Sequence, residues 1–445
     1  MELTESFLKR ISVQLGSAVN AFQLSLDQSS VISLRLNPSK KFEHQYTEKI
    51  PWCSDGFYLT KRPVFTLDPL LHAGAFYVQE ASSMLLEQAL RQHVDLSKPL
   101  CVLDLCASPG GKSTHLLSLI SDKSVLVSNE VIKNRTASLK ENLIKWGYSN
   151  SIVTNNDAQH FSRLPQLFDL IVVDAPCSGE GLFRKDKNAM LEWSEPHTKH
   201  CSVRQQRIFE DVLPALKPGG ILVYSTCTFN PSENEKNIDT WIEKFNLESL
   251  SLELLNEWKV TEIKSAHATS YQCWPHLVKG EGFYMSVLKK STQSAIDLNP
   301  SVKKPILDVV QLKSLPSLKN KNCRWLQKEN ELYIMSPETQ YMFSILQSPL
   351  HVLQAGTHAG QLIRNELVPS HSLALSNELK KGFYNEVELN HTDAIKFLRK
   401  QSFEINESTK GWLLVTHQNL ALGWVKNLGN RFNNYYPANW RILMS

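Results

Sequence analysis

The sequence lacks long hydrophobic runs and paired cysteines. No stretch approaches the roughly 18–20 apolar residues of a membrane-spanning helix, and the polar, acid-containing opening MELTESFLKR resembles neither a secretory signal nor a transit peptide. We therefore expect a cytoplasmic protein with no membrane partner. The 8 cysteines include no Cys-x-x-Cys pair, which argues against a disulfide scaffold and against a zinc site. We expect free thiols and no bound metal.

A large excess of charge of one sign is also missing. The 48 Lys and Arg against 44 Asp and Glu leave a net charge of +4, which neither demands nor excludes a nucleic-acid partner. Residues 411–445 differ, because they contain Lys426, Arg431 and Arg441, several aromatic residues and no Asp or Glu. Cations for phosphates and aromatic faces for bases are typical of RNA-binding surfaces. A small β domain with an aromatic core explains this composition equally well.

Short apolar strands alternate with amphipathic helices over residues 96–290. This alternation predicts an α/β, doubly wound, Rossmann-like domain whose parallel sheet is covered by helices on both faces. Residues 1–95 are expected to form a small α/β accessory unit, 291–345 a linker and small intermediate region, and 346–445 a further domain. The predicted strands of the central domain are 101–105, 125–128, 152–154, 169–174 and 220–224.

The first predicted strand ends in a glycine turn that leads into a helix. Glycines let the backbone approach a ligand, and the free N–H groups of a helix N-terminus attract a polar or anionic group. The turn is not a P-loop, because Cys106 stands where that motif needs a glycine, and the Gly-x-Gly-x-x-Gly fingerprint is missing too. The candidate ligand-binding residues here are Cys106, Ala107, Ser108, Pro109, Gly110, Gly111 and Lys112.

Acidic residues follow the next two strands. Glu130 stands where a nucleotide-binding sheet places the acceptor for ribose hydroxyls, and Asp157 follows the third strand, where it could contact an adenine edge. Each acid alone is more often a helix cap or a loop residue. A glycine turn and two acids at three successive strand ends favour an adenosine ligand without a triphosphate. S-adenosylmethionine fits this pattern better than ATP or NAD.

Two cysteines follow two further strands. Cys177 lies just after Asp174, and Cys227 follows the strand that ends near Tyr224. The ligand crevice of an open parallel sheet lies outside the carboxyl ends of its strands, so both thiols can face one cleft. A packed thiol is the usual interpretation of one such cysteine, but less so of two beside a cofactor turn. Cys106 borders that turn, and the other five cysteines are expected to be structural.

Two thiols and an acid beside a methyl donor suggest methylation of cytosine at carbon 5. That carbon is too weak a nucleophile by itself, but thiolate addition at carbon 6 gives an enamine whose carbon 5 can attack a sulfonium methyl group. Asp174 next to N3 would support the developing charge. The second cysteine would act in removal of the carbon 5 proton and release of the first thiol. The residues do not show whether Cys177 or Cys227 is the nucleophile.

These motifs resemble the Sun/Nop family of RNA cytosine-5 methyltransferases, most closely its bacterial members that act on 16S ribosomal RNA. The resemblance implies that Cys227 is the nucleophile, that Cys177 assists product release, and that Asp174 lies near both cofactor and target base. It also implies that S-adenosylmethionine is the cofactor, held by the glycine turn, Glu130, Asp157 and Asp174. The matching segments are 35–38, 77–84, 106–112, 174–181, 225–229, 233–235, 274–276 and 281–283.

The resemblance extends to the end of the sequence and to the substrate. Residues 423–426 and 433–437 are similar to a PUA-like RNA-binding domain, which we expect over 346–445, with Lys426, Arg431 and Arg441 as RNA contacts. The expected partner is ribosomal RNA or the small ribosomal subunit. We also expect a monomer, because no surplus apolar surface helix stands out in the sequence. Arg184 and Lys185, in the loop after Cys177, are further candidates for phosphate contacts, although a solvated charged loop is an equal alternative.

Two other functions stay open. Methylation of an exocyclic amine needs no thiol and ordinarily uses an Asp/Asn-Pro-Pro-aromatic motif, where this sequence has Asp174-Ala175-Pro176-Cys177. A non-catalytic ribosome-assembly factor could retain the same fold and bind RNA without using Cys227.

Overall fold

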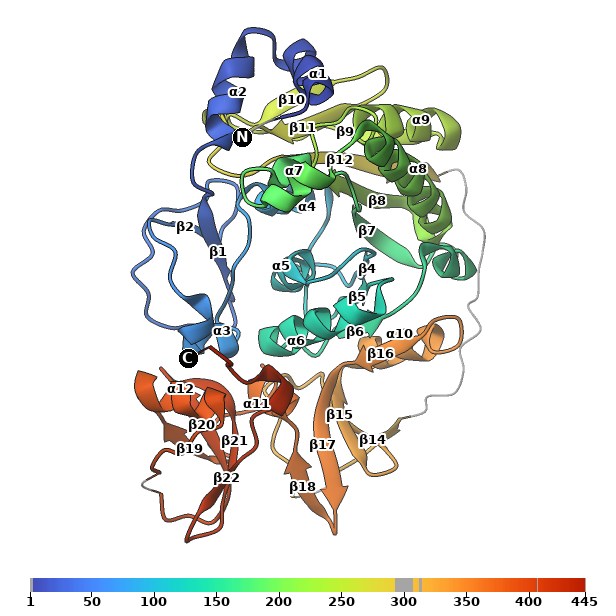
Figure 1. Ribbon diagram of the computed structural model, residues 1–445. Helices are drawn as coiled ribbons and strands as arrows, with labels where there is room; N and C mark the ends of the chain where they lie inside the picture. The colour runs from blue at the N-terminus through green and yellow to red at the C-terminus, as the bar shows by residue number, and fades with distance from the viewer. Residues whose placement is uncertain (1–2, 293–306, 312–313, 406, 445) are drawn as a thin grey trace.

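The computed structural model describes residues 3–292, 307–311, 314–405 and 407–444. Its largest sheet has ten strands, in the order β10-β11-β12-β8-β7-β4-β5-β6-β16, with β9 paired to β12 (Figure 1). The strand order reverses at β4, whose neighbours are β5 and β7, so a ligand crevice is expected at this point of the sheet. The predicted Rossmann-like fold is thereby confirmed. Five strands run parallel: β4 (Cys101–Asp104), β5 (Val125–Asn129), β6 (Ser151–Thr154), β7 (Phe168–Asp174) and β8 (Leu216–Thr226).

Antiparallel strands extend this sheet at both edges, which the alternating pattern did not predict. Beyond β8, the antiparallel strand β12 (Phe283–Lys290) pairs with both β11 (Thr269–Cys273) and β9 (Leu247–Leu250), and β10 (Thr261–Lys264) closes the edge. At the other edge, β16 (Val352–Ala355) pairs antiparallel with β6. A segment far along the chain therefore completes the sheet.

Helices cover both faces of the sheet. On one face, α8 (Glu195–Val212), α9 (Glu235–Phe245) and α10 (Pro337–Leu346) pack on strand residues such as Leu103 and Ile171. On the other, α4 (Leu86–His93), α5 (Gly111–Leu119) and α6 (Thr136–Trp146) pack on residues such as Val102 and Leu170. Successive residues of each strand thus face opposite layers, as expected for a sheet buried on both sides.

The N-terminal region forms a small unit beside the large sheet. Helices α1 (Glu5–Leu15) and α2 (Val19–Leu26) precede a three-stranded sheet of β1 (Ile32–Leu36), β2 (Gly56–Leu59) and β3 (Phe76–Tyr77), and α3 (Pro69–His72) lies between β2 and β3. Phe7 and Phe22 of the two helices pack on Phe183, Phe229 and Trp274. This aromatic cluster includes Phe229, which lies two residues after Cys227.

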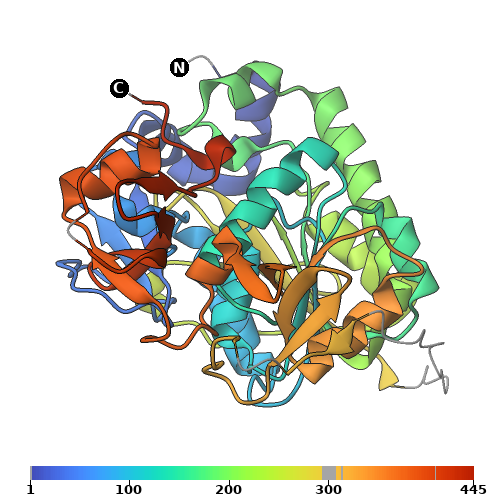
Figure 2. The ribbon, with the colours of Figure 1, turned by 90° about the horizontal axis from the view of Figure 1, so that it is seen from below.

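Two smaller sheets make up the C-terminal region. They lie at the end of the molecule opposite α1 and α2 and are seen side by side from below (Figures 1 and 2). The first is β13 (Asp308–Val309), β14 (Arg324–Lys328), β15 (Glu331–Met335), β17 (Thr357–Ile363) and β18 (Glu366–Pro369). The second is β19 (Asn385–Glu388), β20 (Gly411–His417), β21 (Leu420–Asn427) and β22 (Phe432–Asn434), with α11 (His371–Leu375) and α12 (His391–Arg399) nearby.

The expected boundary between residues 345 and 346 does not separate two structural units. It falls at the end of α10, and the sheet of β13 to β18 has strands on both sides of it. Residues 293–306 and 312–313 of the expected linker lie outside the described residues. Within the described part of the chain, no helix has the length and apolar character needed to cross a membrane.

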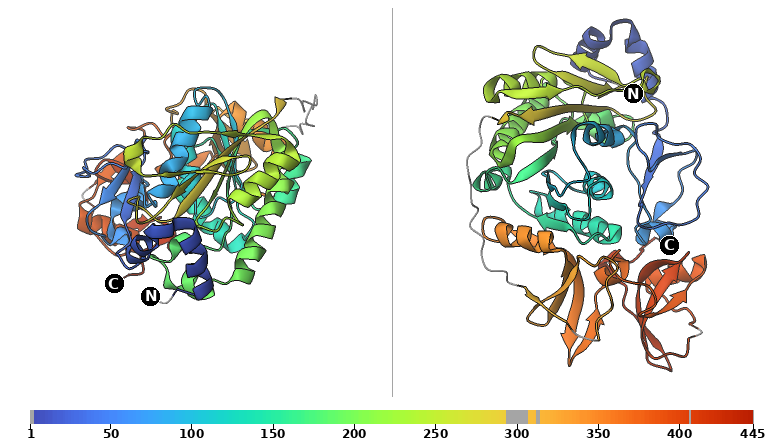
Figure 3. Two further views of the ribbon diagram at one scale, coloured as in Figure 1. Left: turned by 90° about the horizontal axis from the view of Figure 1, so that it is seen from above. Right: turned by 180° about the vertical axis from the view of Figure 1, so that it is seen from behind.

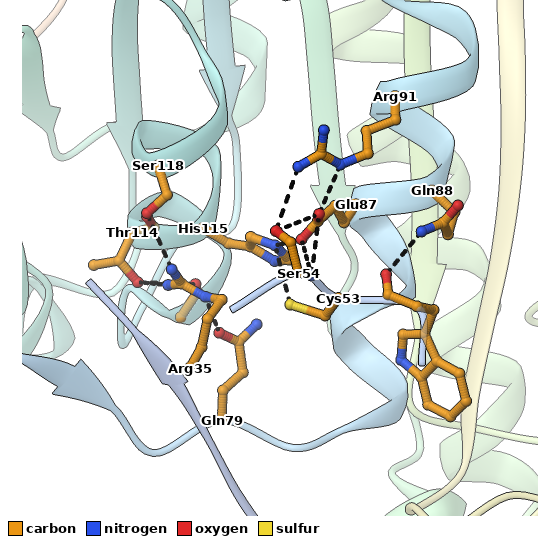
Figure 4. A network of polar contacts seen from close by, with 12 residues as sticks. Arg35, Cys53, Ser54, Gln79, Glu87, Gln88, Arg91, Thr114, His115 and Ser118 are labelled. Atoms are coloured by element: carbon orange, nitrogen blue, oxygen red, sulfur yellow. Dashed lines mark hydrogen bonds and ion pairs between the residues drawn. The ribbon is translucent and has the colours of Figure 1, made fainter. Parts of the chain in front are cut away.

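Buried polar side chains join the N-terminal unit to α5 and α6. The Arg35 guanidinium, fully buried, donates to Gln79 Oε1 at 3.0 Å, to Ser118 Oγ at 3.1 Å and to Thr114 Oγ1 at 2.7 Å (Figure 4). Asn37 donates to the carbonyls of Gly74 at 2.9 Å and of Trp146, the last residue of α6, at 3.0 Å. The view from behind shows the N-terminal unit along one side of the large sheet (Figure 3).

We predict that Asn37→Ala lowers the free energy of unfolding by about 1–3 kcal/mol, because two carbonyl groups each lose a buried hydrogen bond. Urea denaturation of the full chain measures this difference. The matched control is Ser39→Ala, which removes an exposed hydrogen bond to Tyr148 and should change the free energy by less than about 0.5 kcal/mol. Equal effects of the two substitutions would show that Asn37 does not join the two units.

Candidate functional site

The glycine turn leads directly from β4 into α5. Gly110 has a φ of 114°, a backbone conformation that favours glycine, and α5 begins at Gly111. The backbone N–H of Ala107 donates to Asn129 O at 2.8 Å, and the Asn142 side chain donates to Pro109 O at 2.9 Å. These bonds fix the turn between β5 and α6.

The carboxyl ends of the five parallel strands surround a cavity of about 270 Å³. It brings together predicted residues from every one of these strand ends, and its walls also include the apolar Val131, Ile132, Ala158 and Ile208. The predicted site residues that line it are Cys106, Ser108, Glu130, Asp157, Asp174, Cys177 and Cys227.

A second cavity of about 180 Å³ lies between the glycine turn and the N-terminal unit. Cys106, Ser108 and Asp174 line both cavities, so the two adjoin at these residues. The second also contains Ala107, Pro109, Gly111 and Lys112 of the predicted turn. Its opposite wall is residues 77–80 and Ser83 of the N-terminal unit, a contribution that the sequence did not assign to any site.

Glu130 and Asp157 occupy different settings at the cavity. Glu130 is buried, and its carboxylate accepts from the Ile132 N–H at 2.8 Å and lies 3.6 Å from Arg135. Asp157 accepts from the Gln159 N–H at 3.2 Å and pairs with the half-exposed Arg207, also at 3.2 Å. Glu130 therefore has the protected position expected of an acceptor for ribose hydroxyls. Asp157 caps a helical turn and is more exposed.

Asp174 is held by two side chains. The Lys112 ammonium lies 2.8 Å from its Oδ2, and the Ser225 hydroxyl donates to its Oδ1 at 2.7 Å. Burial of Lys112 disfavours its charge, but the charge and hydrogen bond of Asp174 outweigh this effect and raise the pKa of the lysine. Lys112 is thus a firmly charged cation between the glycine turn and the end of β7.

Asp104 lies fully buried beneath the turn and was not among the predicted site residues. It accepts from the Ser113 hydroxyl at 2.6 Å, while its Oδ1 has no hydrogen-bond partner. Burial, opposed by Ser113 and Lys112, raises the pKa of Asp104 to about 7. An acid at the last position of a strand, directly before a glycine turn, is the sequence signal that could have identified it.

The two candidate catalytic thiols meet at the end of β7 and β8. The sulfur atoms of Cys177 and Cys227 are 3.1 Å apart, and the Cys227 backbone N–H donates to the Cys177 sulfur at 3.3 Å. The hydrogen bond with Cys227, together with burial, raises the pKa of the Cys177 thiol well above its ordinary value. Cys177 thus keeps its proton and can donate it to the Cys227 sulfur.

A buried carboxyl group supports the loop that carries Cys177. Glu233 accepts from the Ser178 N–H at 2.9 Å, from the Ser178 hydroxyl at 2.5 Å and from Gln205 at 3.0 Å. Burial, partly offset by these bonds, raises the pKa of Glu233 to about 7. Glu180, also buried, pairs with Arg10 of α1 at 2.6 Å. Sequence reasoning noted Glu233 only within a motif and gave it no role.

The candidate RNA contacts differ in their settings. The Arg184 side chain is 3% exposed and pairs with Glu281 at 2.9 Å. Its charge is neutralised inside the protein, so this is not the setting of a phosphate-binding residue. Lys185, Arg431 and Arg441 are exposed. The Lys426 ammonium lies 5.2 Å from the centre of the Trp412 ring, on the sheet of β19 to β22.

Cys53, Glu87 and His115 form a buried group that could in principle hold a metal ion (Figure 4). His115 Nε2 lies 3.1 Å from one Glu87 oxygen, and the other is 2.7 Å from Arg91. Burial lowers the pKa of His115 to about 4, so its neutral ring donates to Glu87. The protein's own groups satisfy this carboxylate, and the absence of a metal stays a prediction.

Three family models match the chain. The model described as 16S rRNA methyltransferase RsmB/F matches residues 92–289. Models described as the N-terminal domain of 16S rRNA methyltransferase RsmF and as the methyltransferase RsmF PUA domain match residues 3–81 and 384–442.

Named relatives match over most of their length. Ribosomal RNA small subunit methyltransferase F of Erwinia tasmaniensis is 30% identical over 408 residues, which are 87% of this chain and 84% of the relative. The protein of that name from Aeromonas hydrophila is 31% identical over 405 residues, which are 88% of this chain and 84% of that relative.

Solved structures share the fold. A methyltransferase homologue from Pyrococcus horikoshii aligns with a TM-score of 0.52 at 27% identity, over 65% of this chain and 100% of that one. NSun6 from Pyrococcus horikoshii, solved with SFG, aligns with a TM-score of 0.53 at 18% identity, over 64% of this chain and 97% of that one.

We predict that Glu233 makes stability depend on pH. A carboxyl group whose pKa is higher in the folded than in the unfolded protein favours folding while protonated, so its contribution is lost as pH rises through about 7. In Glu233→Gln, the neutral amide oxygen can accept from the Ser178 N–H and Gln205 while its NH2 donates to the Ser178 hydroxyl, and the fall in unfolding free energy between about pH 5 and 8 should be smaller by up to about 3 kcal/mol. Denaturant unfolding across this range measures it. Asp104 still titrates in the variant, so some dependence remains, but parallel profiles would contradict the assignment.

Proposed function

The chain belongs to the ribosomal RNA small subunit methyltransferase F family, and from this premise we propose that it methylates carbon 5 of a cytosine in 16S ribosomal RNA through a covalent bond between Cys227 and carbon 6. The observation that carries the proposal is the pair of thiols 3.1 Å apart beside Asp174 and the nucleoside-sized cavity. Methylation of an exocyclic amine has no use for this pair. An enzyme with this substrate would act in the cytoplasm.

The cavity residues fit S-adenosylmethionine, the cofactor of this methyltransferase. Glu130 would accept from the ribose hydroxyls, while Val131, Ile132 and Ile208 provide apolar walls for the adenine ring. The glycine turn and Asp157 are the other residues that we expect to contact the cofactor. When bound, the cofactor supplies an electrophilic methyl group on a sulfonium sulfur.

The proton distribution between the thiols favours Cys227 as the nucleophile. The hydrogen bond with Cys227 and burial raise the pKa of Cys177, which disfavours a thiolate on Cys177, and we assign the nucleophilic sulfur of the pair to Cys227. The Lys112 ammonium is attracted by a Cys227 thiolate as well as by Asp174. The nearby ammonium thus favours negative charge on the Cys227 sulfur during the reaction.

Each polar group of the site then has a task. The Cys227 thiolate adds to carbon 6 of the cytosine as N3 takes up a proton, and Asp174, oriented by Lys112 and Ser225, accepts a hydrogen bond from the resulting N3–H. Addition makes carbon 5 nucleophilic enough to accept a methyl group. Once the carbon 5 proton has been removed, the Cys227–carbon 6 bond breaks, and the Cys177 thiol protonates or hydrogen-bonds the departing sulfur.

The sheet of β19 to β22 offers a surface suited to RNA. Lys426 lies over the Trp412 ring, and Tyr435, 42% exposed, packs edge-on against that ring at 4.5 Å between centroids. The cation can bind a phosphate, and partly exposed aromatic rings beside it can stack a base. The target cytosine must leave its stack or pair to reach thiols inside a cavity, so affinity for the surrounding RNA has to come from such surfaces.

We predict that the two cysteines fail in different ways when replaced. Cys227→Ala should lose at least about 1,000-fold in methylation rate, because no covalent adduct forms. Cys177→Ala should form the adduct but release it slowly, so a covalent protein–RNA complex accumulates. The measurement uses labelled S-adenosylmethionine with 16S ribosomal RNA and with small subunits, maps 5-methylcytosine, and resolves adducts on denaturing gels.

The matched control is Cys201→Ser, a buried cysteine outside the cavity, which should methylate normally. Undiminished methylation by Cys227→Ala would remove the assigned nucleophile, and label on adenine would overturn the cytosine target. A wild-type protein that binds RNA without transferring label would be an assembly factor.

We predict that Trp412→Ala weakens RNA binding about 5- to 100-fold, the loss expected from removing one base-stacking ring. Lys426→Gln should reduce the slope of log affinity against log salt by about 0.7–0.9, the value of one phosphate contact. Fluorescence anisotropy with 16S ribosomal RNA fragments, at several salt concentrations, measures both. If both variants bind as the wild type does, RNA does not contact this surface.

A further inference from the structure

The two thiols of the site lie close enough to react with each other. Their sulfur atoms are 3.1 Å apart, so they would have to approach by only about 1 Å to reach the length of a disulfide bond. Backbone hydrogen bonds hold the two segments side by side, from Ala175 N to Ser225 O at 2.9 Å and from Gly181 N to Cys227 O at 2.8 Å. Because these bonds bracket Cys177, they keep its sulfur close to the sulfur of Cys227.

A small oxidant can reach both sulfurs. Cys177 and Cys227 line the 270 Å³ cavity at the strand ends, as does Cys106. Burial raises the pKa of Cys106 far above its ordinary value, which keeps that thiol protonated and slow to oxidise. Among the described cysteines, all eight of the sequence, no other pair of cysteine sulfurs is in contact.

We propose that Cys177 and Cys227 form a reversible disulfide when the protein meets a peroxide, and that this bond switches methyl transfer off. The inference shares its residues with the proposed function. It does not depend on which base is methylated, because it concerns only the two sulfur atoms and their access to solvent.

The chemistry balances with hydrogen peroxide as the oxidant. The Cys227 thiolate attacks one peroxide oxygen, the O–O bond breaks, and a sulfenic acid forms as the other oxygen leaves as water after taking up a proton. The Cys177 sulfur then attacks the Cys227 sulfur, the S–O bond breaks, and the Cys177 proton leaves with the hydroxyl group as a second water. Two thiols have been oxidised to one disulfide, and one peroxide has been reduced to two waters.

The disulfide removes both thiols from catalysis and leaves the cofactor residues in place. Glu130 lies directly after β5 and the glycine turn joins β4 to α5, and the new bond involves none of these segments. We therefore expect oxidised protein to bind S-adenosylmethionine with an affinity within about 3-fold of the reduced protein while forming no adduct with RNA. Disulfide formation also keeps Cys227 from irreversible oxidation to a sulfinic acid.

The test treats the purified full chain with a small excess of hydrogen peroxide and then follows intact mass, free thiols and cross-linked peptides. We expect the 8 free thiols to fall by two, a peptide joining Cys177 to Cys227, loss of methyl transfer, and recovery of both thiols and activity with dithiothreitol. Calorimetry with S-adenosylmethionine should show retained binding. Cys201→Ser should form the same disulfide.

The informative variant is Cys177→Ser, which cannot form the disulfide. After peroxide, its Cys227 should carry added oxygen that dithiothreitol does not remove, and its capacity to form RNA adducts should not return. If wild-type protein shows this same irreversible oxidation and no cross-linked peptide, the proposal is wrong. Failure of the reduced wild type to make 5-methylcytosine would instead contradict the proposed function and leave the disulfide result intact.

Discussion

The parallel pairing of β7 with β8 is the constraint on which the site depends. Asp174 lies opposite Ser225 in this pair, and the register brings Cys177 and Cys227, 50 residues apart in the sequence, to sulfur contact at 3.1 Å. A shift of one residue would turn side chains to the other face of the sheet. The backbone bonds from Ala175 and Gly181 extend the pairing beyond the strands. The two thiols and the carboxylate therefore lie together because the backbone pairing of the sheet continues into the loops.

The position of Lys112 links these groups to the rest of the protein. Lys112 is the cation that connects the glycine turn to Asp174, and its charge is favoured mainly by Asp174. Its position depends on α5, which the N-terminal unit holds through the buried Arg35. The N-terminal unit therefore supports the site in two ways. It contributes a wall of the second cavity and an anchor for the helix that carries the cation.

The sequence was sufficient to predict the features that are local in the chain. The apolar strands, the glycine turn and the residues directly after each strand end could be read along the sequence, and parallel topology then implied one cleft for Glu130, Asp157, Cys177 and Cys227. Pairings between distant segments could not be predicted. The insertion of β16 beside β6 and the contacts of Arg35 with α5 depend on packing that no local pattern encodes.

Charged residues were the least predictable. Arg184 belongs by sequence to an exposed cationic loop, yet the protein buries it against Glu281, which lies 97 residues further on. From the sequence alone, Glu233 looks like a solvent-exposed acid near the start of a helix. In the structure it is buried, and its hydrogen bonds to Ser178 stabilise the loop that carries Cys177. Whether a charge is solvated or paired inside depends on the partner that folding brings to it.

The central claim is a covalent bond from Cys227 to carbon 6 of a cytosine. It is tested most directly with a 16S ribosomal RNA in which cytosine is replaced by 5-fluorocytosine, because the fluorine cannot leave as the carbon 5 proton does and the adduct is trapped. Incubation with S-adenosylmethionine, nuclease digestion and peptide mass spectrometry should find a methylated fluorocytidine on Cys227. A trapped nucleotide on Cys177, or no trapped nucleotide in a preparation that methylates ordinary RNA, would contradict the account.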